Sequence, residues 1–233
     1  MHAVCRHAAS LSPRLPIDYG SEMAAETLIV PRAWFDMEEP WATPPGCIPV
    51  RLRVATDGST PRLPTSIAIW FDDEYLTVLF SSADDHVQAT FDEHDAPLYQ
   101  EDVVELFLAP RTTERYFELE VSPRGTMFDA AIESPDGVRG TMRVDRDWNC
   151  EGLMAAVRKV IETDGSATID TVVRVPFSSL GCTTPAPGEN WRANFFRIDR
   201  HPRLGDEYSA WQPTLRSPAD FHVTAAFGTL RFA

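Results

Sequence analysis

The stretch Ser66-Ile-Ala-Ile-Trp-Phe-Asp-Asp-Glu-Tyr-Leu-Thr-Val-Leu-Phe80 decides the fold class of this chain. Two runs rich in β-branched and aromatic residues flank the acidic triplet at 72–74, and this arrangement predicts a β-hairpin. Residues 153–162 and 167–175 repeat the pattern around a turn that contains the pair Asp164-Gly165. The sequence therefore predicts two hairpins.

More short strands are expected between and after the hairpins. In residues 116–121 polar and apolar side chains alternate, so Glu118 and Glu120 share one face of a strand while Phe117 and Leu119 take the other. Roughly ten short strands without a long amphipathic helix predict an all-β fold, an antiparallel β-sandwich with immunoglobulin-like or jelly-roll-like layers. The remaining strands are predicted at residues 103–108, 126–132, 190–198, 208–212 and 227–232.

The region before the first hairpin has a different composition. Residues 31–49 contain five prolines, which resist both helix and central strand, and this pattern predicts an extended strap over the core. Trp34 and Trp41 in this strap are expected to pack inward. We therefore divide the chain into an N-terminal extension, residues 1–30, expected to be partly disordered, and a single β-sandwich domain, residues 31–233.

The charge of the chain narrows the classes of partner. Its 21 Lys and Arg residues face 35 Asp and Glu residues, which gives a net charge of −14 over 233 residues. Such a field repels phosphate backbones and anionic lipid surfaces, so we expect neither a nucleic-acid nor a membrane partner. No apolar run approaches the roughly eighteen residues of a membrane span, and no secretory signal is visible. The cell compartment and the oligomeric state stay open.

The cysteines favour free thiols over a metal centre. Cys5, Cys47, Cys150 and Cys182 are widely spaced and contain no C-x-x-C pair. A zinc ribbon or a dithiol redox motif is therefore disfavoured. Two disulfides would be compatible with the count but are not needed in a domain of this size, so the disulfide state stays open.

One stretch carries a family resemblance. The run Pro97-Leu-Tyr-Gln-Glu-Asp-Val-Val-Glu-Leu-Phe-Leu-Ala-Pro110 resembles the acidic segment and V-E-x-F strand of carbohydrate-binding module family 9, a group of β-sandwich sugar-binding domains. The resemblance extends over roughly residues 50–232 and implies non-catalytic binding of a saccharide or polyol. Other pieces occur in the family's order at residues 66–80, 116–125, 172–181, 188–199, 208–214 and 221–232.

The resemblance also implies which residues hold the sugar. In the family two aromatic side chains clamp the ring, and the matching positions here are Tyr99, where a tryptophan would be expected, and Trp211. Stacking works because the axial C–H groups of a pyranose present an apolar face to the aromatic ring. A core position for Trp211 stays an equal alternative. The strand 116–121 departs from the family, because Glu118 and Glu120 stand where an arginine and an amide can occur.

Glu105, the glutamate of the V-E-x-F motif, is the main polar candidate. Its neighbours Val103 and Phe107 share its face of the strand, so its carboxylate is expected to be half-buried and to need a partner. Arg197 on the strand 190–198 is the natural candidate. We expect Glu105 and Arg197 to contact sugar hydroxyls, with Glu118 and Glu120 as weaker contacts.

Metal binding and catalysis are further alternatives. The acidic turns with Asp72, Asp73, Asp84 and Asp85 would suit Ca²⁺, although acidic residues are also common in turns for local hydrogen bonding alone. No other cofactor is indicated. A protein-interaction or scaffold domain that has lost the sugar site, or a glycoside hydrolase that uses the acidic face, are the competing functions. Because pairing with Arg197 would keep Glu105 ionised, we expect binding without turnover.

Overall fold

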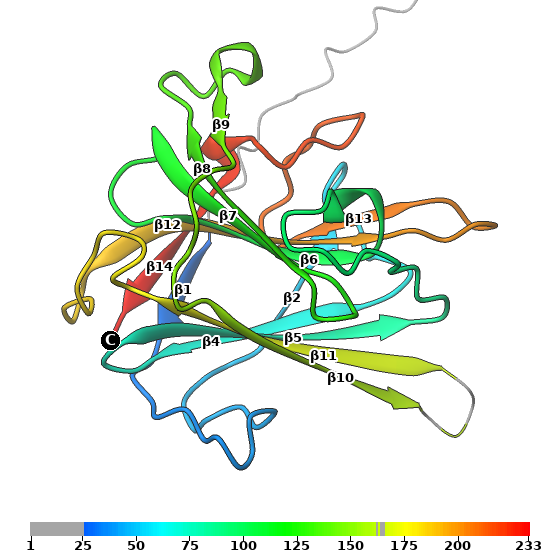
Figure 1. Ribbon diagram of the computed structural model, residues 1–233, viewed down its shortest axis with the longest axis horizontal. Helices are drawn as coiled ribbons and strands as arrows, with labels where there is room; N and C mark the ends of the chain where they lie inside the picture. The colour runs from blue at the N-terminus through cyan, green and yellow to red at the C-terminus, as the bar shows by residue number, and fades with distance from the viewer. Residues whose placement is uncertain (1–25, 162, 164–165) are drawn as a thin grey trace, which may run out of the picture.

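The computed structural model describes residues 26–161, 163 and 166–233, and it contains two β-sheets packed face to face (Figure 1). The predicted all-β sandwich is therefore confirmed. One sheet has nine strands and the other has five. All strand pairs are antiparallel except the pair of β1 with β14, which is parallel.

The nine-stranded sheet forms the upper layer in Figure 1. Its main path runs in the order β1-β14-β12-β6-β7-β8-β9, while β13 pairs with β12 and with β3. The predicted strands are present, and β1, β3 and β9 are additional to the prediction. The bounds are β1 (Thr27–Val30), β3 (Arg53–Val54), β6 (Val103–Ala109), β7 (Arg115–Val121), β8 (Met127–Glu133), β9 (Arg143–Asp145), β12 (Asn190–Asp199), β13 (Glu207–Ala210) and β14 (Gly228–Phe232).

The five-stranded sheet contains both predicted hairpins. Its order is β10-β11-β5-β4-β2, and the two hairpins are β4–β5 and β10–β11, although the predicted turn pair Asp164-Gly165 of the second lies outside the described residues. Three single-turn 3₁₀ helices lie in the connections: η1 (Leu98–Gln100), η2 (Arg139–Thr141) and η3 (Thr224–Ala226). The strand bounds are β2 (Val50–Arg51), β4 (Thr65–Phe71), β5 (Tyr75–Asp84), β10 (Met154–Ile161) and β11 (Ala167–Pro176).

Apolar side chains fill three layers because several strands are apolar on both faces. The main core lies between the sheets and includes Leu106, Leu119 and Phe195. A second cluster lies on the outer face of the nine-stranded sheet, where it includes Phe107 and Phe196. Burial of that outer face requires covering loops, and these loops create the cavity described below.

The predicted strap covers the outer face of the five-stranded sheet, at the bottom of Figure 1. The ring of Phe35 stacks on that of Trp70 with their centroids 6.5 Å apart. Trp41 is half-buried beneath the guanidinium of Arg158, as expected for an inward-packing residue. Trp34 is 78 % exposed, so the prediction that it packs inward is wrong.

The N-terminal region is only partly covered by the structure. Residues 1–25 of the predicted extension lie outside the described residues, while residues 27–30 form β1 at the edge of the large sheet. Within the described part of the chain, no helix is long and apolar enough to cross a membrane. Cys47, Cys150 and Cys182 are free thiols, as the sequence favours.

Candidate functional site

A cavity of about 390 Å³ opens on the outer face of the nine-stranded sheet. We call it the glutamate cavity. Strands β6, β7, β8 and β12 supply its floor, and η1, η2, β13 and the segment 219–222 supply its walls. The lining residues are Tyr99, Glu105, Glu118, Glu120, Phe128, Arg139, Met142, Val144, Arg146, Ile198, Arg200, Tyr208, Ala219, Asp220, Phe221 and His222.

Three glutamates lie together on the cavity floor, and we call them the glutamate triad. Glu105 on β6 lies directly opposite Glu120 on β7, and Glu118 shares the same face because it is two residues from Glu120. One carboxylate oxygen from each residue lies within 4.8 Å of the others. The residues are buried, with exposed fractions of 2 % for Glu105, 7 % for Glu118 and 0 % for Glu120. The sequence pattern placed Glu118 and Glu120 on one face correctly.

Burial makes it costly to ionise the three carboxyl groups of the triad. It raises the pKa of all three carboxyl groups, and it raises that of Glu118 to about 7 against the lowering effect of Arg139 and Arg146. The negative charge of neighbouring glutamates raises the pKa of Glu105 and Glu120 further. No amide, hydroxyl or cationic group among the described residues donates to either carboxylate oxygen of Glu120, and the hydrogen bond that it shares with Glu118 is one between two carboxyl groups and raises its pKa further.

Two tyrosines form the aromatic wall of the cavity. Tyr99 in η1 is 40 % exposed, and Tyr208 on β13 is half-buried. Arg200 connects them, because its guanidinium donates to the backbone oxygen of Tyr99 at 2.6 Å and to the hydroxyl of Tyr208 at 2.5 Å. Phe221 packs edge-on against Tyr208 with the ring centroids 6.1 Å apart. Two aromatic rings therefore line one opening and are joined by a single cation.

Each arginine of the cavity has a partner outside the glutamate triad. Arg139 in η2 forms an ion pair with Asp220 at 3.1 Å. The guanidinium of Arg146 lies over the ring of Phe128, 5.6 Å from its centroid. Arg200 has Asp206 as its ion-pair partner. Within the described residues, none of these arginines forms an ion pair with the triad.

His222 lies beside the triad as a neutral side chain. Its Nδ1 is 2.6 Å from the hydroxyl of Tyr116, and its Nε2 is 3.7 Å from Oε1 of Glu118. Burial lowers its pKa to about 3, and the nearby Arg139 adds to the shift. The imidazole therefore contributes no positive charge to balance the glutamates at neutral pH.

Arg197 is not part of this cavity, which corrects the expected pair with Glu105. The strand register places Arg197 opposite Val104, so its side chain lies on the inner face of the sheet while Glu105 lies on the outer face. There its guanidinium contacts Asp84 at 3.0 Å and Asp199 at 2.8 Å. Arg197 therefore bridges the two sheets.

Trp211 is a core residue, and its expected place in a clamp with Tyr99 is wrong. It is 2 % exposed and packs against Phe195 with the ring centroids 5.8 Å apart. A Cβ atom at Gly228 would lie 2.2 Å from the Trp211 ring, so the absence of a side chain at Gly228 makes room for the indole. Tyr208, three residues earlier, is the aromatic residue that shares the cavity with Tyr99.

Among the described residues, the aspartates of the acidic turns are not grouped as a set of possible metal ligands. Asp72 and Asp73 lie at one end of β5 and Asp84 and Asp85 at the other, so the four are not brought together. Asp72 contacts Arg174 at 2.5 Å and also accepts hydrogen bonds from the backbone of the turn.

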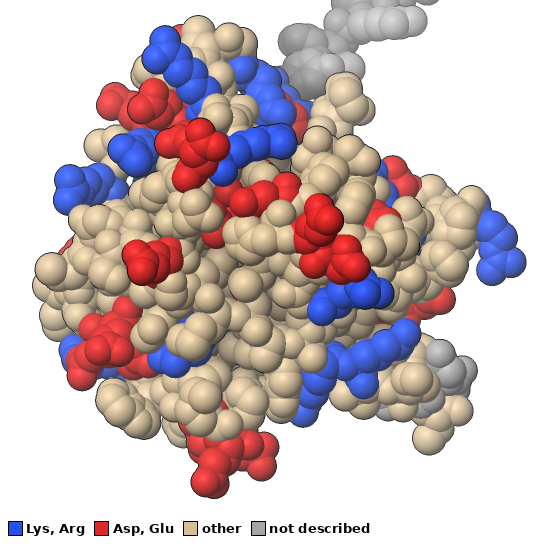
Figure 2. All heavy atoms as spheres, viewed as in Figure 1, with Lys and Arg blue, Asp and Glu red and all other residues tan. Residues whose placement is uncertain are grey.

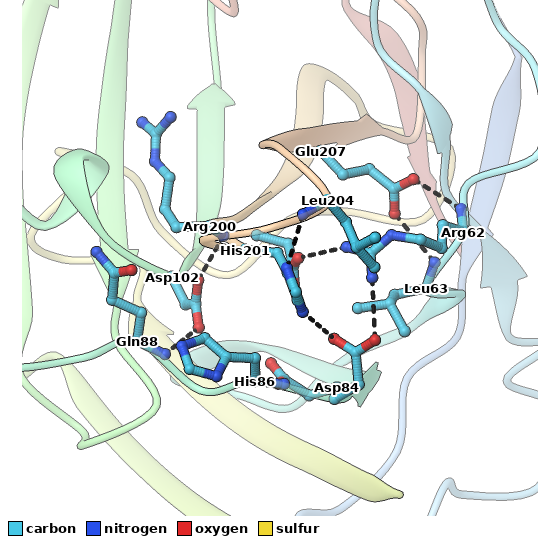
Figure 3. A network of polar contacts seen from close by, with 12 residues as sticks. Arg62, Leu63, Asp84, His86, Gln88, Asp102, Arg200, His201, Leu204 and Glu207 are labelled. Carbon is cyan, nitrogen blue, oxygen red and sulfur yellow. Dashed lines mark hydrogen bonds and ion pairs between the residues drawn. The ribbon is translucent and has the colours of Figure 1, made fainter.

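The remaining acidic-turn residues likewise have cationic neighbours. Asp73 pairs with Arg32, and Asp84 with Arg197. Asp85 pairs with Arg62 at 3.0 Å. Figure 3 shows the polar contacts at that end of β5, where the backbone N–H of His86 donates to Asp84 at 2.8 Å.

Sequence reasoning missed several residues of the cavity. Arg200, His222 and Arg139 come from loops or a short 3₁₀ turn, and strand periodicity says nothing about where such segments fold. Tyr208 carried a signal, because it lies on a predicted strand three residues before Trp211. Side chains three residues apart on a strand point to opposite faces, so alternation could have placed Tyr208 on the face opposite to that of Trp211.

Three solved structures that share this architecture are described as carbohydrate-binding proteins or candidates for that role. A protein from Bacteroides uniformis ATCC 8492, described as a candidate carbohydrate-binding protein, matches with a TM-score of 0.71 and 16 % identity over 90 % of this chain and 100 % of its own. A family 9 module from Caldicellulosiruptor kristjanssonii in complex with cellotriose matches with a TM-score of 0.59 and 12 % identity over 89 % of this chain and 93 % of its own. A structure of such a module from the same organism with glucose has a TM-score of 0.57, 13 % identity and coverage of 89 % and 96 %.

These identities establish a shared fold, and the family follows from the sequence itself. No curated protein matches the chain. The sequence profile described as carbohydrate-binding family 9 matches residues 57–232, which is most of the chain and includes the strands that form the floor of the cavity. That family consists of non-catalytic binding modules. The chain therefore belongs to carbohydrate-binding family 9.

Proposed function

We propose that this protein binds a saccharide, without transforming it, in the glutamate cavity. The observation that carries the proposal is the pairing of Tyr99 and Tyr208 at one opening above polar groups. Aromatic rings supply the apolar face that a pyranose needs, and Arg200 and the triad supply groups for its hydroxyls. The volume of about 390 Å³ lies within the roughly 300–1,000 Å³ of small-molecule sites.

The relatives suggest which sugars to test first. Family 9 modules have been solved with glucose and with cellotriose, so we infer that glucose and short gluco-oligosaccharides are suitable first ligands for this chain. The cavity differs from the predicted site in both its second aromatic residue and its partner for Glu105. A glycan array should therefore accompany the glucose series, because the changed polar groups favour a changed sugar preference.

Alanine substitution of the two tyrosines tests this site directly. We expect Tyr208→Ala and Tyr99→Ala each to weaken saccharide binding by about 1–3 kcal/mol in isothermal titration calorimetry, because stacking area is lost. The melting temperature measures folding in parallel. Trp34→Ala is the matched control, since Trp34 is also an exposed aromatic residue but lies on the strap.

Two results would contradict the proposal. Loss of binding in Trp34→Ala with normal binding in both tyrosine variants would move the sugar site to the strap. No binding to any glycan of the array would favour the alternative of a protein-interaction or scaffold domain.

Hydrolysis is the second candidate, because one observation favours it. A general acid must hold its proton near neutral pH, and the raised pKa of Glu118, at about 7, meets this condition. Arg197 lies on the other face of the sheet, so it does not keep Glu105 ionised. Family membership still favours binding, so we expect no release of product from oligosaccharides or aryl glycosides between about pH 4 and 8. Sustained release that disappears in Glu118→Gln would establish the hydrolase instead.

A further inference from the structure

We propose that the glutamate triad binds one hard divalent cation, Ca²⁺ first among them, at the floor of the cavity. Glu105, Glu118 and Glu120 would each supply carboxylate oxygen to the ion. This site goes beyond saccharide binding, because cation binding is measured with no sugar present.

The spacing of the three carboxylates suits a single ion. Ca²⁺ binds oxygen ligands at about 2.3–2.6 Å, so two ligand oxygens on opposite sides of one ion lie about 5 Å apart. The triad oxygens lie within 4.8 Å of one another, and all three are therefore within reach of one ion. An oxygen-only set of donors favours Ca²⁺, Mn²⁺ or Mg²⁺ over Zn²⁺, which prefers nitrogen and sulfur ligands.

The lack of partners is the second, independent observation. Glu120 is fully buried, yet no amide, hydroxyl or cationic group among the described residues donates to either of its carboxylate oxygens, and its hydrogen-bonding neighbour is Glu118, another carboxyl group of the triad. A buried polar group without a partner is costly, and a buried charge more so. The same residue lines the cavity, so its oxygens are directed to the place where an ion would arrive.

The surrounding charges leave room for a cation. Arg139, Arg146 and Arg200 line the cavity but contact Asp220, Phe128 and Asp206 respectively. His222 is neutral because of its burial. Among the described residues, no arginine or lysine therefore forms an ion pair with the three carboxylates. Figure 2 shows acidic and basic side chains close together over the nine-stranded sheet, which is the side of the molecule that an ion would approach.

The ion would leave part of its coordination sphere open. Ca²⁺ takes 6–8 oxygen ligands, and three glutamates supply between three and six. The remaining positions would face the cavity, where water or the hydroxyl groups of a ligand could occupy them. The ion would thus form part of the cavity floor.

The test uses the whole chain after chelator treatment and dialysis. Binding of Tb³⁺, detected by luminescence sensitised by the tyrosines of the cavity and displaced by Ca²⁺, reports the site, and calorimetry with Ca²⁺ alone gives the stoichiometry. We expect one equivalent in the native protein and at least a tenfold weaker affinity in Glu120→Gln, which keeps the size of the side chain. Asp85→Asn is the control, because it removes one exposed acidic group from the turn at the end of β5 and should bind as the native protein does.

Folding of each variant is checked by circular dichroism. If Glu120→Gln fails to fold, Glu118→Gln at the more exposed edge of the triad makes the same test. Equal Ca²⁺ affinity in the native protein and the triad variant, loss of affinity in Asp85→Asn, or no binding at millimolar Ca²⁺, Mn²⁺ and Mg²⁺ would each overturn the proposal. Binding of Zn²⁺ alone would overturn the assigned class of cation. Saccharide titrations with and without chelator are separate, so failure of sugar binding leaves the cation result readable.

Discussion

Two buried groups of carboxylates lie at opposite faces of the nine-stranded sheet, and they differ in how their charge is balanced. On the inner face, Asp84 and Asp199 surround Arg197, and we call this the arginine-centred cluster. On the outer face, the glutamate triad has no such cation in contact with it among the described residues. The first arrangement joins residues of both sheets around one cation, and the second is the one that we propose to bind a cation.

The guanidinium of Arg197 in the inner cluster has hydrogen-bond partners besides the two carboxylates. Arg197 also donates to the hydroxyl of Thr65 at 3.2 Å and to the backbone oxygen of Ala83 at 2.6 Å. Its partners come from both sheets, so the cluster connects the layers. A fully hydrogen-bonded buried pair of this kind is strongly destabilised when one partner is removed, whereas the triad already lacks partners.

The largest effect is expected from removing the cation of the inner cluster. Arg197→Met leaves Asp84 buried without its cationic partner and leaves Asp199 with Arg62 alone, so it should lower the free energy of unfolding by about 3–5 kcal/mol, measured by urea denaturation. Arg139→Met is the control, since Arg139 is more than half exposed and pairs with Asp220 at the surface. If both variants lost the same free energy of unfolding, the buried cluster would be no more important for stability than a surface ion pair.

A pH titration should show a smaller effect, from Asp102 beside the inner cluster. Burial raises the pKa of Asp102 to about 7, and the negative charges of Asp84 and Asp199 add to this. The folded state then holds a proton that the unfolded state releases near pH 4, so stability falls as pH rises from about 4 to about 7. Three pKa units correspond to about 4 kcal/mol at most.

The variant Asp102→Asn checks this assignment. Its free energy of unfolding should change less between pH 4 and 7 than that of the native protein, since the group that binds the extra proton is gone. Its absolute stability should also fall, because backbone N–H groups of Gln88 and Arg200 donate to this carboxylate at 2.6 Å. Asp36→Asn, at an exposed position on the strap, should keep the native pH dependence.

The smallest effect is expected in the triad and has the opposite sign. At pH 8 with chelator present, Glu120→Gln should raise the free energy of unfolding by about 1–2 kcal/mol, because it removes from a buried site a carboxyl group whose ionisation is opposed by burial and by Glu105 and Glu118. Thermal and urea unfolding measure the change. A loss of stability comparable to that of Arg197→Met would show that Glu120 has a structural partner after all.

The sequence predicted those parts of the site that follow from strand alternation. Glu118 and Glu120 were placed on one face, because successive side chains of a strand point to opposite faces. The partner of Glu105 was wrong, because it depends on which residue of β12 lies opposite. The register pairs Glu105 with Phe196, and a displacement by one residue moves Arg197 to the other face.

Trp211 shows a second limit of prediction from sequence. A tryptophan at a strand end is compatible with a rim or a core position, and local residues do not decide between them. The deciding contact comes from Gly228, which is distant in sequence and makes room for the ring. Both hairpins, by contrast, depend on neighbouring residues only, and the structure contains them as predicted.

The strap and the glutamate cavity lie on opposite sides of the molecule. It covers the outer face of the five-stranded sheet, while the glutamate cavity opens on the outer face of the other sheet, across the whole thickness of the sandwich (Figure 1). A surface that rests against the strap therefore leaves the cavity unobstructed. The opening of the cavity and the strap therefore face away from each other.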